Sequence, residues 1–136
     1  MAPRVLFLCT ENSARSQMAE GLLRHWGGSA FEVYSAGTRP STVHPLTGRV
    51  MQEVGIDITG QRSKSVDIFA GMTFDVVVTL CDIAREACPV FPAARRQLHW
   101  DIPDPRAVEG SEDERLAAFR HVRDLIRARI RETFGV

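Results

Sequence analysis

The chain has 136 residues, of which 44% are hydrophobic and 25% charged, and its formal net charge is zero. This length and composition predict one globular domain over residues 1–136 that needs neither disulfides nor metal to form a core. The charge balance argues against binding to nucleic acid or to a membrane surface. No apolar run approaches the roughly 20 residues of a membrane span, and the first residues lack a signal-peptide pattern, so we expect a cytoplasmic location.

Apolar periodicity and turn residues divide the chain into alternating strands and helices. In chain order, the patterns predict strand 4–8, a helix ending at residues 27–28, strand 31–35, helix 45–54, a short helix 67–70, strand 74–80, a short helix 82–88, strand 97–100 and a long C-terminal helix. Ser111 and Glu114 form a capping box at the start of this last helix.

This alternation predicts an α/β fold in which four parallel strands form one sheet with helices on both faces, a three-layer sandwich. We expect the flavodoxin-like strand order 2-1-3-4, with a binding site at the switch point between the first and third strands. Cys9 and Cys81 directly follow those two strands. They are therefore expected to face each other across one crevice.

The three cysteines are Cys9, Cys81 and Cys88. An odd number in a reducing compartment argues against a static disulfide framework. The residues alone leave buried thiols, a metal site and a thiol relay as alternatives. The spacing of Cys81 and Cys88 differs from that of structural zinc sites, and only His99 is a plausible further ligand, so we predict no metal site.

Residues 9–16, here called the anion loop, have the pattern of an oxyanion-binding turn. They connect a predicted buried strand to a helix start, where unpaired N–H groups and the helix dipole attract negative charge. Arg15 would donate to two oxygens of a bound tetrahedral anion. The same field favours the thiolate of Cys9, to which Ser16 would donate. The predicted oxyanion-binding residues are Thr10, Glu11, Asn12, Ser13, Ala14, Arg15 and Ser16. The alternative is that Cys9 is a buried core residue and Arg15 a surface residue.

The segment VLFLCTENSARSQMAEGLLR, residues 5–24, closely resembles the active-site loop of the arsenate reductases built on the low-molecular-weight protein tyrosine phosphatase fold. The resemblance continues in residues 34–38, 79–89 and 99–105, and so covers most of the chain. It implies an enzyme that reduces arsenate to arsenite and is regenerated by thioredoxin. Phosphate or sulfate would compete with arsenate for the loop, and we expect a monomer.

The resemblance also implies the order in which the thiols act. Cys9 attacks the arsenic, Cys81 then attacks the Cys9 sulfur so that arsenite leaves, and Cys88 attacks Cys81. Thioredoxin reduces the resulting Cys81–Cys88 disulfide by thiol exchange. Asp104 would protonate the leaving oxygen, although spacing alone does not distinguish it from Asp101.

The spacing of the last two cysteines has a geometric consequence. Residues seven apart on a helix are separated by roughly 10.5 Å along its axis, whereas a disulfide tolerates a Cα separation of at most about 7 Å. The predicted helix 82–88 therefore has to unwind or loop out when Cys81 bonds to Cys88.

Two other functions stay open at this point. A low-molecular-weight phosphatase would need Cys9, Arg15 and Asp104 but has no use for the other two cysteines. Phosphatases of this kind commonly carry an aromatic residue directly after the Asp-Pro pair, where this chain has Arg106. The other alternative is a non-catalytic module that binds oxyanions or senses the redox state.

Some members of this family bind a potassium ion beside the anion loop. Asn12, Glu20 and Ser35 match ligands of that site, but Lys64, the only lysine of the chain, stands where the cation-binding relatives have an acidic residue. A lysine ammonium would take the place of the cation and pair with Glu20. We therefore predict no cofactor and no potassium dependence.

Overall fold

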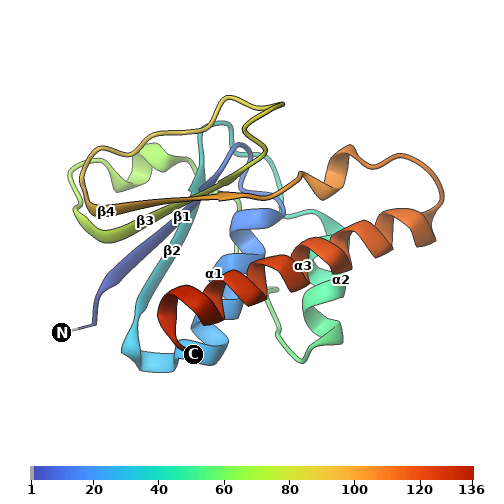
Figure 1. Cartoon of the computed structure of the whole chain (residues 1–136), viewed down its shortest axis with the longest axis horizontal. Helices are drawn as coiled ribbons and strands as arrows, with labels where there is room; N and C mark the ends of the chain where they lie inside the picture. The colour runs from blue at the N-terminus through green and yellow to red at the C-terminus, as the bar shows by residue number, and fades with distance from the viewer. Residues whose placement is uncertain (1) are drawn as a thin grey trace.

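The protein is described by a computed structural model that covers residues 2–136 (Figure 1). Its four strands are β1 (Arg4–Cys9), β2 (Glu32–Gly37), β3 (Phe74–Cys81) and β4 (Ala94–Asp101). All neighbouring pairs are parallel and the order is β2-β1-β3-β4. The predicted 2-1-3-4 sheet is therefore confirmed.

Three α-helices lie together along one face of this sheet (Figure 1). They are α1 (Arg15–Gly27), α2 (Pro45–Glu53) and α3 (Glu112–Phe134). Alternate side chains of β1 point to opposite faces. Phe7 packs into the cluster formed with the α-helices. Leu8 packs on the other face with Phe69 and Phe91.

The described chain also has three 3-10 helices, η1 (Gly28–Ala30), η2 (Val66–Phe69) and η3 (Pro105–Ala107). The second face of the sheet is covered by η2 and by the irregular chain before β4. The capping box of Ser111 and Glu114 is confirmed at the start of α3. Within residues 2–136, no helix is long and apolar enough to cross a membrane.

Residues 82–88, here called the redox segment, do not form the predicted helix. The segment contains one turn, in which the backbone N–H groups of Arg85 and Glu86 donate to the carbonyl of Asp82. The prediction was wrong because the Cys81–Cys88 disulfide brings the two Cα atoms to 5.9 Å. An intact helix would hold them roughly 10.5 Å apart, so the segment is unwound as this geometry requires.

Candidate active site

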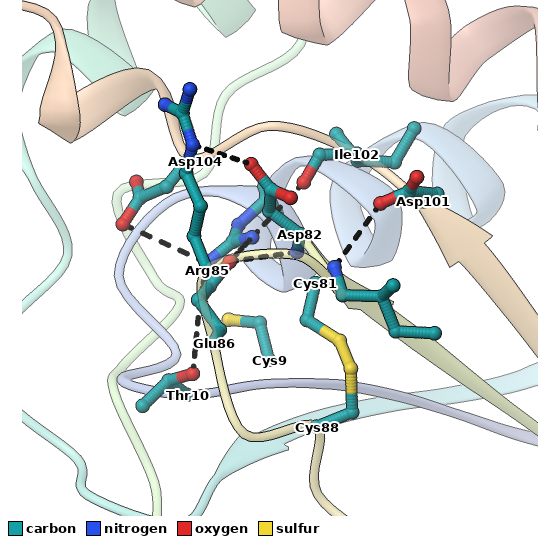
Figure 2. A network of polar contacts seen from close by, with 12 residues as sticks. Cys9, Thr10, Cys81, Asp82, Arg85, Glu86, Cys88, Asp101, Ile102 and Asp104 are labelled. Atoms are coloured by element: carbon teal, nitrogen blue, oxygen red, sulfur yellow. Dashed lines mark hydrogen bonds and ion pairs between the residues drawn. A yellow bond between two sulfur atoms is a disulfide. The ribbon is translucent and has the colours of Figure 1, made fainter.

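The site lies at the carboxyl edge of the sheet, where β1 and β3 end side by side. Leu8 of β1 is in register with Thr79 of β3, so Cys9 and Cys81 leave the sheet at the same edge. Cys9 is a free thiol and is 3% exposed, and Cys81 is fully buried. Figure 2 shows these two residues beside each other, with Cys88 bonded to Cys81.

Apart from the partly exposed Thr10 and Glu11, the anion loop is buried, and it is held by its own side chains. The Sγ of Cys9 lies 2.8 Å from the Oγ of Ser16, and the side-chain amide of Asn12 donates to the same Oγ at 2.7 Å. Asn12 has a positive φ of 51°, a conformation that asparagine tolerates better than most residues. Among the residues described, α1 begins after Ala14 without a side-chain cap, which leaves its first N–H groups available to an anion.

Arg15 projects into the site from the first turn of α1 and is 2% exposed. Its two terminal nitrogens each donate to one carboxylate oxygen of Glu86 at 2.6 Å, and one also donates to the carbonyl of Ile102 at 3.1 Å. Burial lowers the pKa of Arg15, but the hydrogen bonds to Glu86 and the nearby negative charges outweigh it, so the net shift is upward. The guanidinium therefore stays charged.

Asp104 lies on the same side of the site, with a carboxylate oxygen 3.7 Å from Arg15. Arg106 donates to both of its oxygens, at 3.1 Å and 2.9 Å. Burial raises the pKa of Asp104, but the hydrogen bonds from Arg106 and the charge of Arg15 lower it by more, so the pKa lies below its usual value. Asp101 instead accepts from the backbone of Ile83. Position thus distinguishes the two aspartates where spacing did not.

Arg106 links this aspartate to the anion loop. Its guanidinium also pairs with Glu11 at 3.1 Å. A cleft of about 480 Å³ opens here, and its lining includes Thr10, Glu86 and Asp104. Charged groups therefore surround the entrance at the position where phosphatases carry an aromatic ring.

The four predicted supporting residues, Asn12, Glu20, Ser35 and Lys64, are brought together behind the loop. Asn12 donates to Ser35, which in turn donates to Glu20. The Lys64 ammonium lies 3.6 Å from a Glu20 oxygen and donates to the carbonyl of Arg62 at 2.6 Å. Burial lowers the pKa of Lys64, and the charge of Glu20 opposes this only in part.

Cys81, Cys88 and His99 form a group whose potential ligand atoms lie within 4.8 Å of one another. In this state the two sulfurs are joined in a disulfide. Zinc is held by thiolates, imidazoles and carboxylates, usually four of them, so this group offers a metal one ligand, the imidazole. The Nδ1 of His99 is occupied by a hydrogen bond of 2.9 Å with the Thr79 hydroxyl.

Sequence reasoning missed Glu86 and Gln17, and it gave Arg106 no role toward Asp104. Glu86 carries no local signal, because its contact with Arg15 depends on how the redox segment folds. Gln17 is fully buried and donates to the backbone and side-chain oxygens of Asn12 and to the carbonyl of Arg62. Helical spacing puts Gln17 on the same side as Glu20 and Arg24, away from the apolar residues, so no local signal predicted its burial.

Comparison with known proteins agrees with this geometry. Residues 4–134 match the family model described as low molecular weight phosphotyrosine protein phosphatase. An arsenate reductase of Halalkalibacterium halodurans is 44% identical over 127 residues, which cover 93% of this chain and 91% of the relative.

Solved structures give the same result. An arsenate reductase in the phosphate binding state superposes with a TM-score of 0.82 at 33% identity, covering 99% of this chain and 98% of the other. A thioredoxin-dependent arsenate reductase of Corynebacterium glutamicum superposes with a TM-score of 0.73 at 31% identity, covering 98% of this chain and 61% of that protein. The chain therefore belongs to the low molecular weight phosphotyrosine protein phosphatase family and, within it, to the arsenate reductases.

Proposed function

We propose that this protein reduces arsenate to arsenite through Cys9, Cys81 and Cys88 and is regenerated by thioredoxin. One arrangement carries the proposal. The free thiol of Cys9 lies in the anion loop at the end of β1, the neighbouring strand β3 ends at Cys81, and Cys81 is joined to Cys88 in a disulfide. A phosphatase mechanism uses the first thiol and leaves the other two without a role.

In the first step the anion loop binds arsenate through Arg15 and the N–H groups at the start of α1. The thiolate of Cys9 attacks the arsenic, an As–S bond forms, and one oxygen leaves with a proton. We assign delivery of this proton to Asp104, which lies beside Arg15. Because Arg106 holds Asp104 in its charged form, the proton arrives with hydrogen arsenate, whose negative charge raises the proton affinity of the carboxylate.

In the second step the thiolate of Cys81 attacks the sulfur of Cys9. The S–S bond forms, the As–S bond breaks, and its electron pair reduces As(V) to As(III), which leaves as arsenite. Cys88 then attacks Cys81, and Cys9 departs as a thiolate beside Ser16. The two electrons come from one pair of thiols, which ends as the Cys81–Cys88 disulfide.

Thioredoxin closes the cycle by attacking this disulfide. The chain around it is suited to a partner, since Ile83 is 63% exposed and Val90 is 76% exposed. Both residues lie within five positions of Cys88, where thioredoxin has to approach the disulfide. A relay that depends on a thiol reductant also supports a cytoplasmic location. We further propose that the protein acts as a monomer and that phosphate and sulfate compete with arsenate.

We also propose that the Lys64 ammonium substitutes for potassium behind the loop. Its support is the pair with Glu20 and the donation from the Lys64 backbone to the Asn12 side chain at 2.9 Å. The ammonium supplies behind the loop the positive charge that a bound potassium ion would supply, so no free cation is needed.

The test of the relay is NADPH-coupled arsenate turnover with thioredoxin and its reductase, measured for the wild type and for Cys81→Ser and Cys88→Ser. We expect both variants to lose arsenate turnover, because neither can form the Cys81–Cys88 disulfide that thioredoxin reduces. Slow hydrolysis of an aryl phosphate by Cys9 should survive in both. Mass spectrometry after an arsenate pulse should trap a Cys9–Cys81 bond in Cys88→Ser. Full arsenate turnover by either variant would contradict the proposal.

A further inference from the structure

Glu86 occupies the donors that the proposed function assigns to the substrate. Its two carboxylate oxygens accept from the two terminal nitrogens of Arg15, both at 2.6 Å. One of them also accepts from the Thr10 hydroxyl at 3.1 Å, and the other from the backbone of Asp82 at 2.7 Å. Figure 2 shows the contacts of the Glu86 carboxylate with Thr10 and with the backbone of Asp82.

A carboxylate resembles one edge of a tetrahedral oxyanion, with two oxygens that share a negative charge. The planar fork of Arg15 binds such an edge through two parallel hydrogen bonds. A bound arsenate or phosphate needs the same fork, so Glu86 and the oxyanion exclude each other there. Burial raises the pKa of Glu86, but the hydrogen bonds from Arg15 and the Asp82 backbone lower it by more. The pKa therefore lies below its usual value, and the carboxylate stays charged.

Glu86 precedes Cys88 by two residues, so the place of its side chain restricts where the cysteine can lie. With Glu86 on Arg15, the redox segment forms the turn in which Cys88 reaches Cys81. We propose that Glu86 is a positioning residue of the relay: once arsenite has left, Arg15 captures Glu86, and this capture brings Cys88 to Cys81. The inference rests on the proposed three-thiol function.

The step balances without any further reactant. The Cys88 thiolate attacks the Cys81 sulfur of the Cys9–Cys81 disulfide, a new S–S bond forms, and the old one breaks. Cys9 takes the electron pair and leaves as a thiolate, so the protein undergoes no net oxidation. The oxidised protein then keeps its anion loop filled by Glu86 until the Cys81–Cys88 bond is reduced.

The first test measures inorganic phosphate binding by calorimetry. Oxidised protein, with the Cys81–Cys88 bond verified by peptide mapping, is compared with reduced protein for the wild type and Glu86→Gln. If the loop is open in about one tenth of oxidised molecules, the wild type binds phosphate about tenfold more weakly than oxidised Glu86→Gln. The reduced forms should bind alike. Equal affinities of the two oxidised proteins would overturn the inference.

The second test follows the thiols over time. After an arsenate pulse and alkylation quench, Glu86→Gln should form the Cys9–Cys81 bond at the wild-type rate but convert it to Cys81–Cys88 about tenfold more slowly. Glu86→Asp should restore part of this rate, and Glu109→Gln, a charge-matched control at an exposed loop position, should not change it. Unchanged conversion in Glu86→Gln would overturn the positioning role. Absence of any Cys9–Cys81 bond in the wild type would instead contradict the relay itself.

Discussion

The anion loop and the redox segment meet at one edge of the sheet, yet they are held in opposite ways. From Asn12 to Ser16 the loop is buried, and its side chains bond to one another and to α1 and β2. The redox segment is largely exposed and has one backbone turn. Its links to the interior include the disulfide from Cys88 to the buried Cys81 and the hydrogen bonds from Arg15 to the carboxylate of Glu86.

This difference follows from what each segment has to do. Oxyanion binding requires donors that are already in place, because reorienting them during the reaction costs free energy. Moving a sulfur from a helix-like spacing to disulfide distance requires a segment with few contacts to break. The protein therefore places the fixed donors on a buried strand–helix turn and the moving thiol on an exposed one.

The largest effect should come from Arg15→Lys, which keeps the charge but removes the fork. A lysine is a point charge and cannot bind two oxygens in parallel. We expect kcat/KM for arsenate to fall by about 10²–10³-fold, the usual loss when a fixed donor is removed. Steady-state kinetics checks this, with thermal melting to confirm folding. A loss below threefold would mean that the loop does not depend on this residue.

Gly37→Ala tests whether the loop is as rigid as its contacts indicate. A Cβ at Gly37 would lie 2.6 Å from the Thr10 carbonyl oxygen and 2.8 Å from the Asn12 backbone nitrogen. The loop backbone must then move, and we expect a loss of about 1–3 kcal/mol in the free energy of unfolding, measured by urea titration, together with weaker phosphate binding.

The matched control for Gly37→Ala is Gly48→Ala within α2, where an added Cβ meets nothing within 4 Å. Alanine favours a helix over glycine by roughly 0.5–1 kcal/mol, so this change should stabilise the protein. Equal effects of the two substitutions would show that the loop yields easily.

Lys64→Gln tests whether the anion loop also depends on the residues that lie behind it. Loss of the ammonium leaves Arg24, at 3.2 Å, as the one remaining positive charge paired with Glu20 among the described residues, and we expect kcat/KM to fall about fivefold, equivalent to roughly 1 kcal/mol. Arsenate turnover of the wild type should be the same in potassium and sodium salts. A sharp rise in wild-type activity with potassium, or wild-type kinetics in Lys64→Gln, would contradict the substitution of the ammonium for a cation.

The smallest effect lies outside both segments, at the ion pair between Glu53 of α2 and Arg120 of α3. Hydrogen bonds from Arg120 and Arg123 lower the pKa of Glu53 to about 2. Because the pKa is lowered from its ordinary value of 4.5, Glu53 stabilises the folded protein fully at pH values above 4.5. This stability is lost as the pH falls toward about 2. Because the pair is exposed, Glu53→Gln should cost about 1 kcal/mol or less near neutral pH. Acid titrations of unfolding should show the difference vanish at low pH, while arsenate turnover stays unchanged throughout.

Much of this molecule could be predicted from local pattern. The apolar strands and their alternation with helices led to the sheet order, and strand ends at Cys9 and Cys81 led to one shared edge. The anion loop followed from its place between a strand and a helix. These features depend on residues close in the sequence and on the few topologies that parallel strands allow.

Contacts between distant segments could not be predicted in this way. The side chains of Glu86 and Arg106 had no assigned place until the fold brought them to Arg15 and Asp104. The redox segment has a helical pattern, but the Cys81–Cys88 bond overrides it, because a covalent bond sets a Cα separation that a helix cannot meet. The sequence by itself thus determined the sheet, the loop and the three thiols, since local periodicity and strand order specify them. Only the tertiary structure decided which carboxylate lies on Arg15, because that choice depends on the shape of an irregular segment.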